Sequence, residues 1–137
     1  MILPSTLKKI SGESFAQCTS MASINIPSGI QDIYDATFAD CISFTEIHIP
    51  IGVKTIRSDA FSQCSTLKNI YLPRSITEIQ SSAFSGCSWL TYVYYEGSKA
   101  EWDNINISSS GNQYLNSAIK NYNQQTATIE DVKTQID

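Results

Sequence analysis

The sequence is poor in charge and contains no long apolar run. Charged residues make up 16% of the 137 residues, and the nine Lys and Arg residues are scattered singly or in one adjacent pair. Because no basic stripe can neutralise a row of phosphates, we expect no nucleic-acid partner. No apolar run approaches the roughly 18 residues that span a bilayer, so we expect no membrane insertion. The N-terminus also shows no basic segment followed by an apolar one, the pattern of a secretory leader.

Leucine is scarce as well, and the residues that replace it favour strands and turns. Nineteen Ile stand against six Leu, together with seven Tyr, twenty Ser and eight Asn. Ile and Tyr are strand formers, whereas Ser and Asn favour turns over helix interiors. An all-helical bundle is therefore disfavoured. The apolar fraction of 42% is enough for the core of one domain.

Proline and cysteine occur only four times each, and every one of them belongs to an internal repeat. Successive members of three sets lie 23 residues apart: Pro4, Pro27, Pro50 and Pro73; Cys18, Cys41, Cys64 and Cys87; Phe15, Phe38, Phe61 and Phe84. Four complete units, without insertion or deletion, cover residues 3–25, 26–48, 49–71 and 72–94. Such a fixed period is typical of a solenoid built from stacked units.

The length of the unit and its internal pattern predict the shape of each coil. A period of 23 residues falls in the 20–29 range of leucine-rich repeats. Residues 67–72 end in an alternating pattern that predicts a strand, and the proline after it should turn the chain away from the sheet. Residues 53–56 should run along the opposite side as a short extended piece. The predicted fold is an α/β-type, β-rich repeat solenoid, a right-handed leucine-rich-repeat coil with one parallel sheet and little helix.

Side chains that recur in every unit are predicted to form the core. We expect this of the Phe column and of two further columns: Ile10, Ile33, Ile56 and Ile79; Ile24, Ile47, Ile70 and Val93. Stacked cysteines would form a row with a spacing of about 4.8 Å. A row does not converge on one zinc ion, so we expect no metal site. Disulfides between neighbouring coils remain an alternative, but we favour four reduced, buried thiols that fill space.

The repeat resembles a known family, the BspA-like or treponemal-type leucine-rich repeats. Its units carry the same Leu/Ile-Pro, Ala-Phe-x-x-Cys and Leu-x-x-Ile signature over residues 3–94, and residues 95–105 look like the closing segment often found after such repeats. The resemblance implies a curved solenoid on secreted or cell-surface proteins, several of which act in adhesion and protein binding. It implies an extracellular or cell-surface location and no catalytic chemistry.

The two ends of the solenoid differ in the sequence. Residues 95–119 are predicted to form a C-terminal cap, in which Ser98 and Glu101 match a capping box, a short helix runs from about Lys99 to Ile105, and Trp102 covers the last coil. Residues 120–137 are predicted to be a polar tail or linker. No cap precedes residue 3, so we expect a segment of a longer protein, with Met1 supplied by truncation or expression. The alternative is a short natural protein that forms an end-to-end dimer.

No motif in the sequence predicts an enzyme. His48 is the single histidine, and Glu46 lies two residues before it on the same predicted strand face. Both side chains should point into solvent, with no strained nucleophile turn and no oxyanion donors beside them. The sequence therefore predicts no catalytic residue and no cofactor.

The irregular positions of the strands are the informative ones, since the core does not dictate them. They form two predicted columns on the outer face of the sheet: Ser23, Glu46, Asn69 and Tyr92; Asn25, His48, Tyr71 and Tyr94. The candidate ligand-binding residues among them are Glu46, His48, Asn69, Tyr71, Tyr92 and Tyr94. Tyrosine is favoured at protein interfaces, but cross-strand tyrosine pairs can also simply stabilise an exposed sheet. Both interpretations stay open.

The leading functional hypothesis is a non-catalytic module that binds another protein, such as a host or extracellular-matrix component. Extended surfaces of this kind are what solenoids offer to partners. A carbohydrate ligand is the alternative, because exposed Tyr, Asn and Glu can also contact sugars. A third hypothesis makes the array a passive spacer in a larger protein.

Overall fold

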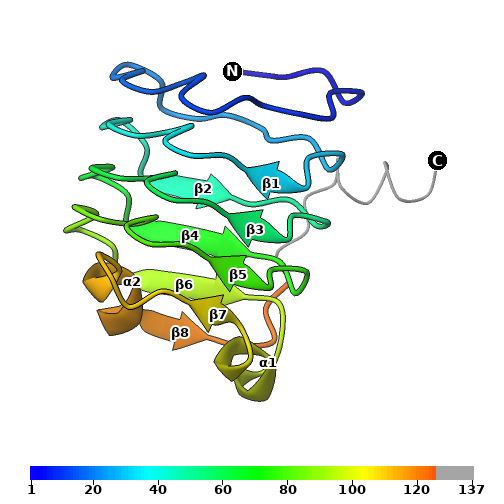
Figure 1. The fold of residues 1–137 in the computed structure, drawn as a ribbon, viewed down its shortest axis with the longest axis vertical. Coiled ribbons are helices and arrows are strands. Elements are labelled where there is room, and N and C mark those ends of the chain that lie inside the picture. Colours follow the sequence, from blue (N-terminus) through cyan, green and yellow to red (C-terminus); the bar gives the residue numbers. More distant parts are fainter. Residues whose placement is uncertain (126–137) are drawn as a thin grey trace.

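The computed structural model describes residues 1–125, which form a stack of coils with one turn per 23-residue unit (Figure 1). The first coil lies at one end of the stack and both helices lie at the other. The strands are β1 (Asp32–Ile33), β2 (Glu46–His48), β3 (Thr55–Ile56), β4 (Asn69–Leu72), β5 (Glu78–Ile79), β6 (Tyr92–Tyr95), β7 (Asn106–Ile107) and β8 (Ile119–Asn121). The helices are α1 (Lys99–Asp103) and α2 (Gln113–Ser117).

The β-rich repeat solenoid predicted from the sequence is confirmed, but the prediction of one sheet is wrong. Two parallel sheets form, in the orders β1-β3-β5-β7 and β2-β4-β6-β8. The second arises because the short extended piece of each coil also pairs with its neighbour. For example, the N–H of Lys54 donates to the carbonyl of Gln31 at 2.8 Å, and that of Arg57 donates to Ile33 at 2.9 Å. Each coil is therefore hydrogen-bonded to the next along both sides.

The return turns are held by a third ladder of backbone hydrogen bonds. The N–H of Phe15 donates to Thr37, that of Phe38 to Ala60 and that of Phe61 to Ala83, at 2.8–2.9 Å. Two positions of every turn have left-handed backbone, with φ between 55° and 73°: Glu13 and Gln17, Ala36 and Asp40, Asp59 and Gln63, Ser82 and Gly86. The turn is thus a fixed backbone shape repeated four times, which satisfies its polar groups without regular helix.

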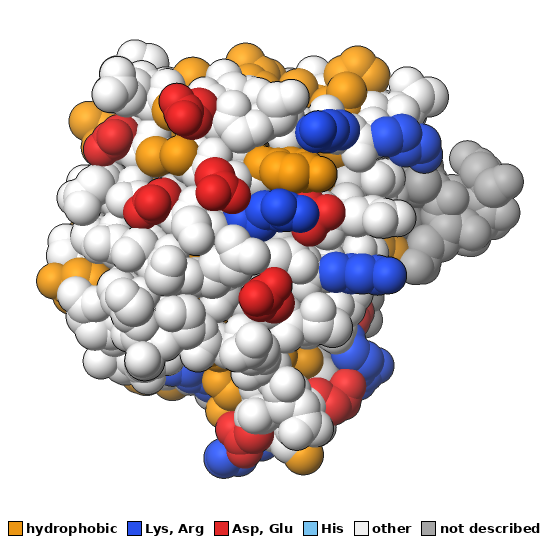
Figure 2. Space-filling model, viewed as in Figure 1, with side chains coloured by type: hydrophobic (Ala, Val, Ile, Leu, Met, Phe, Trp, Pro, Cys, Tyr) orange, Lys and Arg blue, Asp and Glu red, His pale blue; other side chains and the backbone are white. Residues whose placement is uncertain are grey.

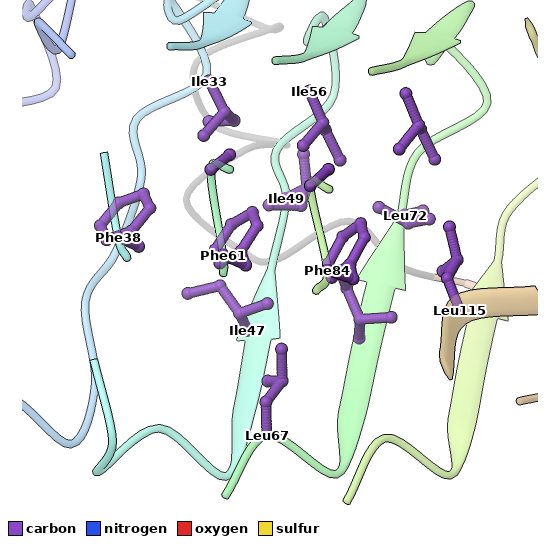
Figure 3. Packing of buried hydrophobic residues seen from close by; sticks show 14 of the residues in the cluster. Ile33, Phe38, Ile47, Ile49, Ile56, Phe61, Leu67, Leu72, Phe84 and Leu115 are labelled. Carbon is purple, nitrogen blue, oxygen red and sulfur yellow. The ribbon is translucent and has the colours of Figure 1, made fainter. Parts of the chain in front are cut away.

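The core lies between the two sheets and consists of the recurring side chains (Figure 3). Phe38, Phe61 and Phe84 are fully buried. With Phe15 they form one continuous stack, with ring centroids 5.3–5.7 Å apart and planes within 11° of parallel. Both predicted Ile columns are buried, which confirms them as core. Phe15 is only half-buried, since no other part of residues 1–125 covers the outer side of the first coil.

All four cysteines are free, and three of them are buried. Each buried thiol donates a hydrogen bond of 3.1 Å to the carbonyl of the phenylalanine in the preceding coil, as Cys64 does to Phe38. Burial raises the pKa of these thiols, to about 11 for Cys41 and about 12 for Cys87. The column therefore fills space as predicted and also links the turns, a role that the sequence did not predict. Cys18, in the first coil, is half-buried.

The predicted capping helix is present as α1. The hydroxyl of Ser98 accepts from the N–H of Glu101 at 3.2 Å, and the carboxylate of Glu101 accepts from the N–H of Ser98 at 3.1 Å. The ring of Trp102 is buried and packs edge-on against Tyr95, with 5.3 Å between centroids. The helix ends at Asp103, two residues before the predicted end.

The rest of the cap closes the stack with two polar side chains. The Nδ2 group of Asn112 donates to the carbonyls of Gln80 and Ser108, at 3.0 and 2.8 Å, and its Oδ1 accepts from the N–H of Phe84 at 3.1 Å. In earlier coils that N–H donates to the carbonyl of the next turn, so the Asn112 amide replaces a missing coil. Lys120 aligns with buried Val93, and its ammonium donates to three carbonyls around the end of α2 at 2.6–2.8 Å.

Strand β8 contains the first two residues of the predicted polar tail, Lys120 and Asn121. The backbone is also tied beyond that strand, where the N–H of Asn123 donates to Gly97 and that of Gln124 donates to Tyr95. The remainder of the predicted tail, residues 126–137, lies outside the described residues.

Candidate binding face

The outer face of the β2-β4-β6-β8 sheet, called here the tyrosine face, carries all six candidate residues. The strand register aligns Glu46 with Asn69 and Asn69 with Tyr92. The second column runs through His48, Tyr71 and Tyr94 in the same way. Strand β8 extends both columns by one place, with Ile119 beside Tyr92 and Asn121 beside Tyr94. Alternate residues of these strands point into the core, which fixes the six outward.

Three aromatic rings of this face stack on one another. The rings of His48 and Tyr71 are 4.0 Å apart between centroids and within 3° of parallel, and those of Tyr71 and Tyr94 are 4.8 Å apart and within 14°. Each ring therefore covers a face of its neighbour and presents an edge outward. Tyr92 stands apart, tilted by 34° from Tyr94 at 6.0 Å.

The charged and polar groups lie mainly at the β2 side of the face. The carboxylate of Glu46 is 3.8 Å from Nε2 of His48, and both side chains are substantially exposed. Partial burial and the charge of Glu46 raise the pKa of Tyr71, so its hydroxyl stays a donor at neutral pH. Within residues 1–125, Nδ1 of His48 and Oδ1 of Asn69 have no hydrogen-bond partner. Both atoms are shielded from solvent by the surrounding side chains.

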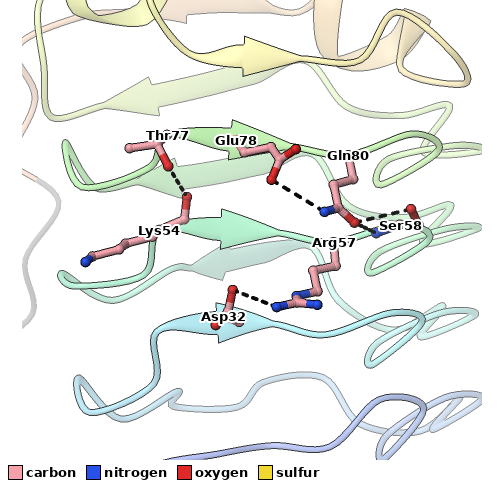
Figure 4. A network of polar contacts seen from close by, with 7 residues as sticks. All are labelled: Asp32, Lys54, Arg57, Ser58, Thr77, Glu78 and Gln80. Carbon is pink, nitrogen blue, oxygen red and sulfur yellow. Dashed lines mark hydrogen bonds and ion pairs between the residues drawn. The ribbon is translucent and has the colours of Figure 1, made fainter.

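The other sheet has a different surface. Several of its polar side chains pair with one another, as Arg57 does with Asp32 at 3.5 Å and as Gln80 does with Ser58 (Figure 4). Its one outward tyrosine, Tyr34, is covered by cations, with Arg57 at 4.5 Å and Lys9 at 4.9 Å from the ring centroid. The space-filling view from the side of Figure 1 shows single acidic and basic side chains scattered over a mostly polar surface (Figure 2).

Two exposed residues near the tyrosine face were not predicted from the sequence. Trp89 lies just before β6, and Ile119 lies on β8; their exposed fractions are 57% and 56%. A signal for Trp89 was present, because the same repeat position holds Ser20, Ser43 and Thr66. Ile119 lies in the cap, where the 23-residue period no longer places a residue in its column.

The arrangement around His48 lacks the parts of a hydrolytic site. The groups packed against its ring are Tyr71 and the Glu46 carboxylate, and no serine or cysteine donates to it in the described chain. Among residues 1–125 no cluster of three or more His, Cys, Asp or Glu side chains could hold a metal ion. Neither described helix is long and apolar enough to cross a membrane.

Comparison with known proteins gives several matches of the same kind. A leucine-rich cell surface protein from Faecalibacterium prausnitzii is 36% identical with a TM-score of 0.76, over 80% of this chain and 29% of its own. A leucine-rich repeat protein from T. pallidum is 27% identical with a TM-score of 0.60, over 68% and 56%. The pneumococcal vaccine antigen PcpA, at 22% identity and a TM-score of 0.71 over 95% and 31%, shares the fold.

The chain therefore spans less than two thirds of each of these three proteins. None of the curated proteins matches it. The family model of the BspA-type leucine-rich repeat region matches residues 1–110 with six copies, which covers the four coils and the start of the cap. With this match over most of its length, the chain belongs to the BspA-type leucine-rich repeat family.

Proposed function

We propose that this chain is a non-catalytic recognition module and that its tyrosine face binds another protein. The observation that carries the proposal is the concentration of Tyr71, Tyr92 and Tyr94 on one side of one sheet, while the other sheet pairs its polar groups internally. Tyrosine gives a large contact area and a hydrogen-bonding tip at low entropic cost, and is enriched at energetically important interface positions.

The ring geometry favours a protein partner over a carbohydrate. A sugar ring packs best on an open aromatic face, but His48, Tyr71 and Tyr94 cover one another at 4.0 and 4.8 Å. What the stack offers outward is a row of ring edges and hydroxyl groups. Ring edges carry the positive part of the aromatic quadrupole, so they suit the carbonyl oxygens and side-chain acceptors of a protein surface.

We further propose that the module acts at a cell surface or outside the cell. The support is the Faecalibacterium relative, which is described as a cell surface protein. Adhesion to a host or extracellular-matrix protein is the form of recognition that fits such a location.

The test replaces the three tyrosines with the residue that other coils use in the same columns. The variant Tyr71→Asn, Tyr92→Asn, Tyr94→Asn follows Asn25 and Asn69, so the coil should still fold. Binding to a panel of immobilised extracellular-matrix proteins is measured by surface plasmon resonance. We expect affinity for any bound matrix protein to fall at least about thirty-fold, since several interface tyrosines are lost together.

The matched control is Tyr34→Ser on the opposite sheet, which copies Ser11 and should leave binding unchanged. Circular dichroism and thermal unfolding confirm that both variants fold. Equal binding by the triple variant and the wild type would overturn the proposal. If neither the wild type nor a variant bound any protein, the hypothesis of a passive spacer would be favoured. Binding detected only on a glycan array would favour the carbohydrate alternative.

A further inference from the structure

Trp89 occupies a repeat position that holds serine or threonine in the other three coils. In the preceding coils the hydroxyl at this position bridges the turns: Ser43 donates to the carbonyl of Thr19, and Thr66 donates to that of Ile42. The indole cannot make this bond, and at 57% exposure it gains little burial in return. Folding does not explain a tryptophan here, because a threonine would contribute a hydrogen bond between the turns that the indole does not make.

Ile119 is a second residue that folding does not explain. It lies in the column of Ser23, Glu46 and Asn69, where outward side chains are polar, and it pairs in register with Tyr92. It is 56% exposed on β8, the last strand of its sheet. An apolar side chain on an edge strand favours unwanted association and is usually avoided.

An uncovered end of the solenoid does not account for this exposure either. Met1 and Ile2 are exposed because the first coil has no described neighbour on its outer side. Trp89 and Ile119 lie at the other end, where Asn112 and Trp102 already close the core. Trp89, Tyr92 and Ile119, called here the C-terminal patch, are neighbours around Thr91, whose hydroxyl donates to the carbonyl of Trp89 and whose carbonyl accepts from the N–H of Ile119. The patch therefore lies on a finished part of the fold.

The segments that build the C-terminal patch carry no acidic side chain, although the whole chain has a net charge of −4. Residues 79–95 and 104–125, which build this end of the sheet, contain no Asp or Glu. The backbone of Lys68 borders the patch, because its carbonyl accepts from the N–H groups of Thr91 and Tyr92 at 2.9 and 3.1 Å. The Lys68 side chain is exposed and forms no ion pair within the described residues. Glu46, the carboxylate of the tyrosine face, lies two strands from Tyr92 and on the strand next to Lys68, whose N–H donates to the carbonyl of Thr45 at 2.8 Å.

We propose that the C-terminal patch is the anchor of the binding face, and that its partner is a protein segment presenting an apolar side chain next to a carboxylate. The apolar side chain packs against Trp89, Tyr92 and Ile119, and the carboxylate lies beside Lys68. This inference rests on the proposed function and moves the centre of recognition toward β6 and β8.

The experiment uses a displayed library of random twelve-residue peptides, selected on the whole chain. Enriched peptides are synthesised and titrated while iodide quenching of the exposed Trp89 is followed. We expect enriched peptides to combine an apolar residue with Asp or Glu and to protect Trp89 from iodide. The variant Trp89→Thr, Tyr92→Asn, Ile119→Asn, built from residues of the same repeat columns, should weaken their binding about thirty-fold.

Lys68→Glu changes one exposed charge and should weaken the same peptides about five-fold at low salt and much less at 1 M salt. Asp35→Asn, on the opposite side of the coil, is the charge control and should have no effect. Enrichment of basic peptides, or of none that depends on the C-terminal patch, would overturn the inference. So would peptides that respond to Tyr71→Asn and Tyr94→Asn but not to the patch variant, although these would leave the proposed function standing. Trp89-dependent binding of glycans alone would overturn both.

Discussion

At the scale of single residues, the turns use left-handed backbone at positions that glycine rarely fills. In the four coils, seven of these eight positions hold Glu, Gln, Ala, Asp or Ser. A residue with a Cβ atom pays roughly 1–2 kcal/mol for this conformation. The neighbouring coils impose it nonetheless, because the backbone groups of each turn bond to the next turn. Gly86, in the last coil, is the one position where the cost is absent.

Replacing Ala36, which has a φ of 55°, with glycine should therefore stabilise the protein. We expect Ala36→Gly to raise the free energy of unfolding by about 0.5–1 kcal/mol, because relief of the left-handed strain exceeds the entropy that glycine loses on folding. Urea unfolding followed by circular dichroism measures the change. Ala39→Gly is the control, since Ala39 has ordinary φ, and it should destabilise by a similar amount. A loss of stability in Ala36→Gly as large as in the control would contradict this account.

Individual side chains also show how far the sequence could predict the molecule. The 23-residue spacing correctly predicted the buried Phe and Ile columns, since equivalent places in stacked coils share one environment. It also aligned Tyr71 with Tyr94. It gave little sign of the left-handed turns, because five of the eight residues there are Glu, Gln, Ala or Ser, which do not favour such backbone. It could not show that the His48 and Tyr71 rings stack, since rotamers depend on neighbours.

At the scale of elements, the sequence predicted α1 but missed half of the sheet structure. The capping box of Ser98 and Glu101 is a local signal that acts within one turn of helix. Strands β1, β3, β5 and β7 have only two residues each, too few for an alternating pattern to be recognised. Their pairing depends on the neighbouring coil, and this information is not local. Helix α2 and the bonds of Asn112 were missed for the same reason.

Asn112 is the element-scale feature whose removal should matter most. We expect Asn112→Ala to lower the free energy of unfolding by about 2–4 kcal/mol, because it leaves the buried N–H of Phe84 and the carbonyl of Ser108 without partners and removes one of the two bonds to the carbonyl of Gln80. Asn112→Asp keeps an acceptor for Phe84 but loses both donors and buries a charge, so it should destabilise at least as much at pH 7. Thermal and urea unfolding give both values.

Asn116→Ala, an exposed change in α2, is the matched control and should lie within about 0.5 kcal/mol of the wild type. If Asn112→Ala lowered the free energy of unfolding no more than Asn116→Ala does, the Asn112 amide would not be closing the stack.

At the scale of the whole molecule, stability is a property of neighbouring coils rather than of one common centre. The coils touch in sequence order, so that a coil in the middle has two partners and the first coil has one described partner. In such arrays the total stability approximates a sum of unit and interface contributions. The Phe stack follows this rule, with Phe61 packed between two rings and Phe15 against one.

The same truncation should therefore cost more in the middle than at the N-terminal end. We expect Phe61→Ala to reduce the free energy of unfolding by about 3–5 kcal/mol, the usual range for a fully buried phenylalanine. Phe15→Ala should cost no more than about half as much, since its ring is half-buried and has a single stacking partner. Guanidinium unfolding measures both, and equal losses would contradict the nearest-neighbour description.

The bonds of Asn112 have a consequence for how such arrays can change in length. Its amide recognises only main-chain atoms, the N–H of Phe84 and the carbonyls of Gln80 and Ser108. Any unit with the same turn shape offers the first two of these atoms, whatever its surface residues. Gene duplication can therefore add units upstream of one unaltered terminator, and a protein engineer can transplant residues 95–125 onto another array of this period.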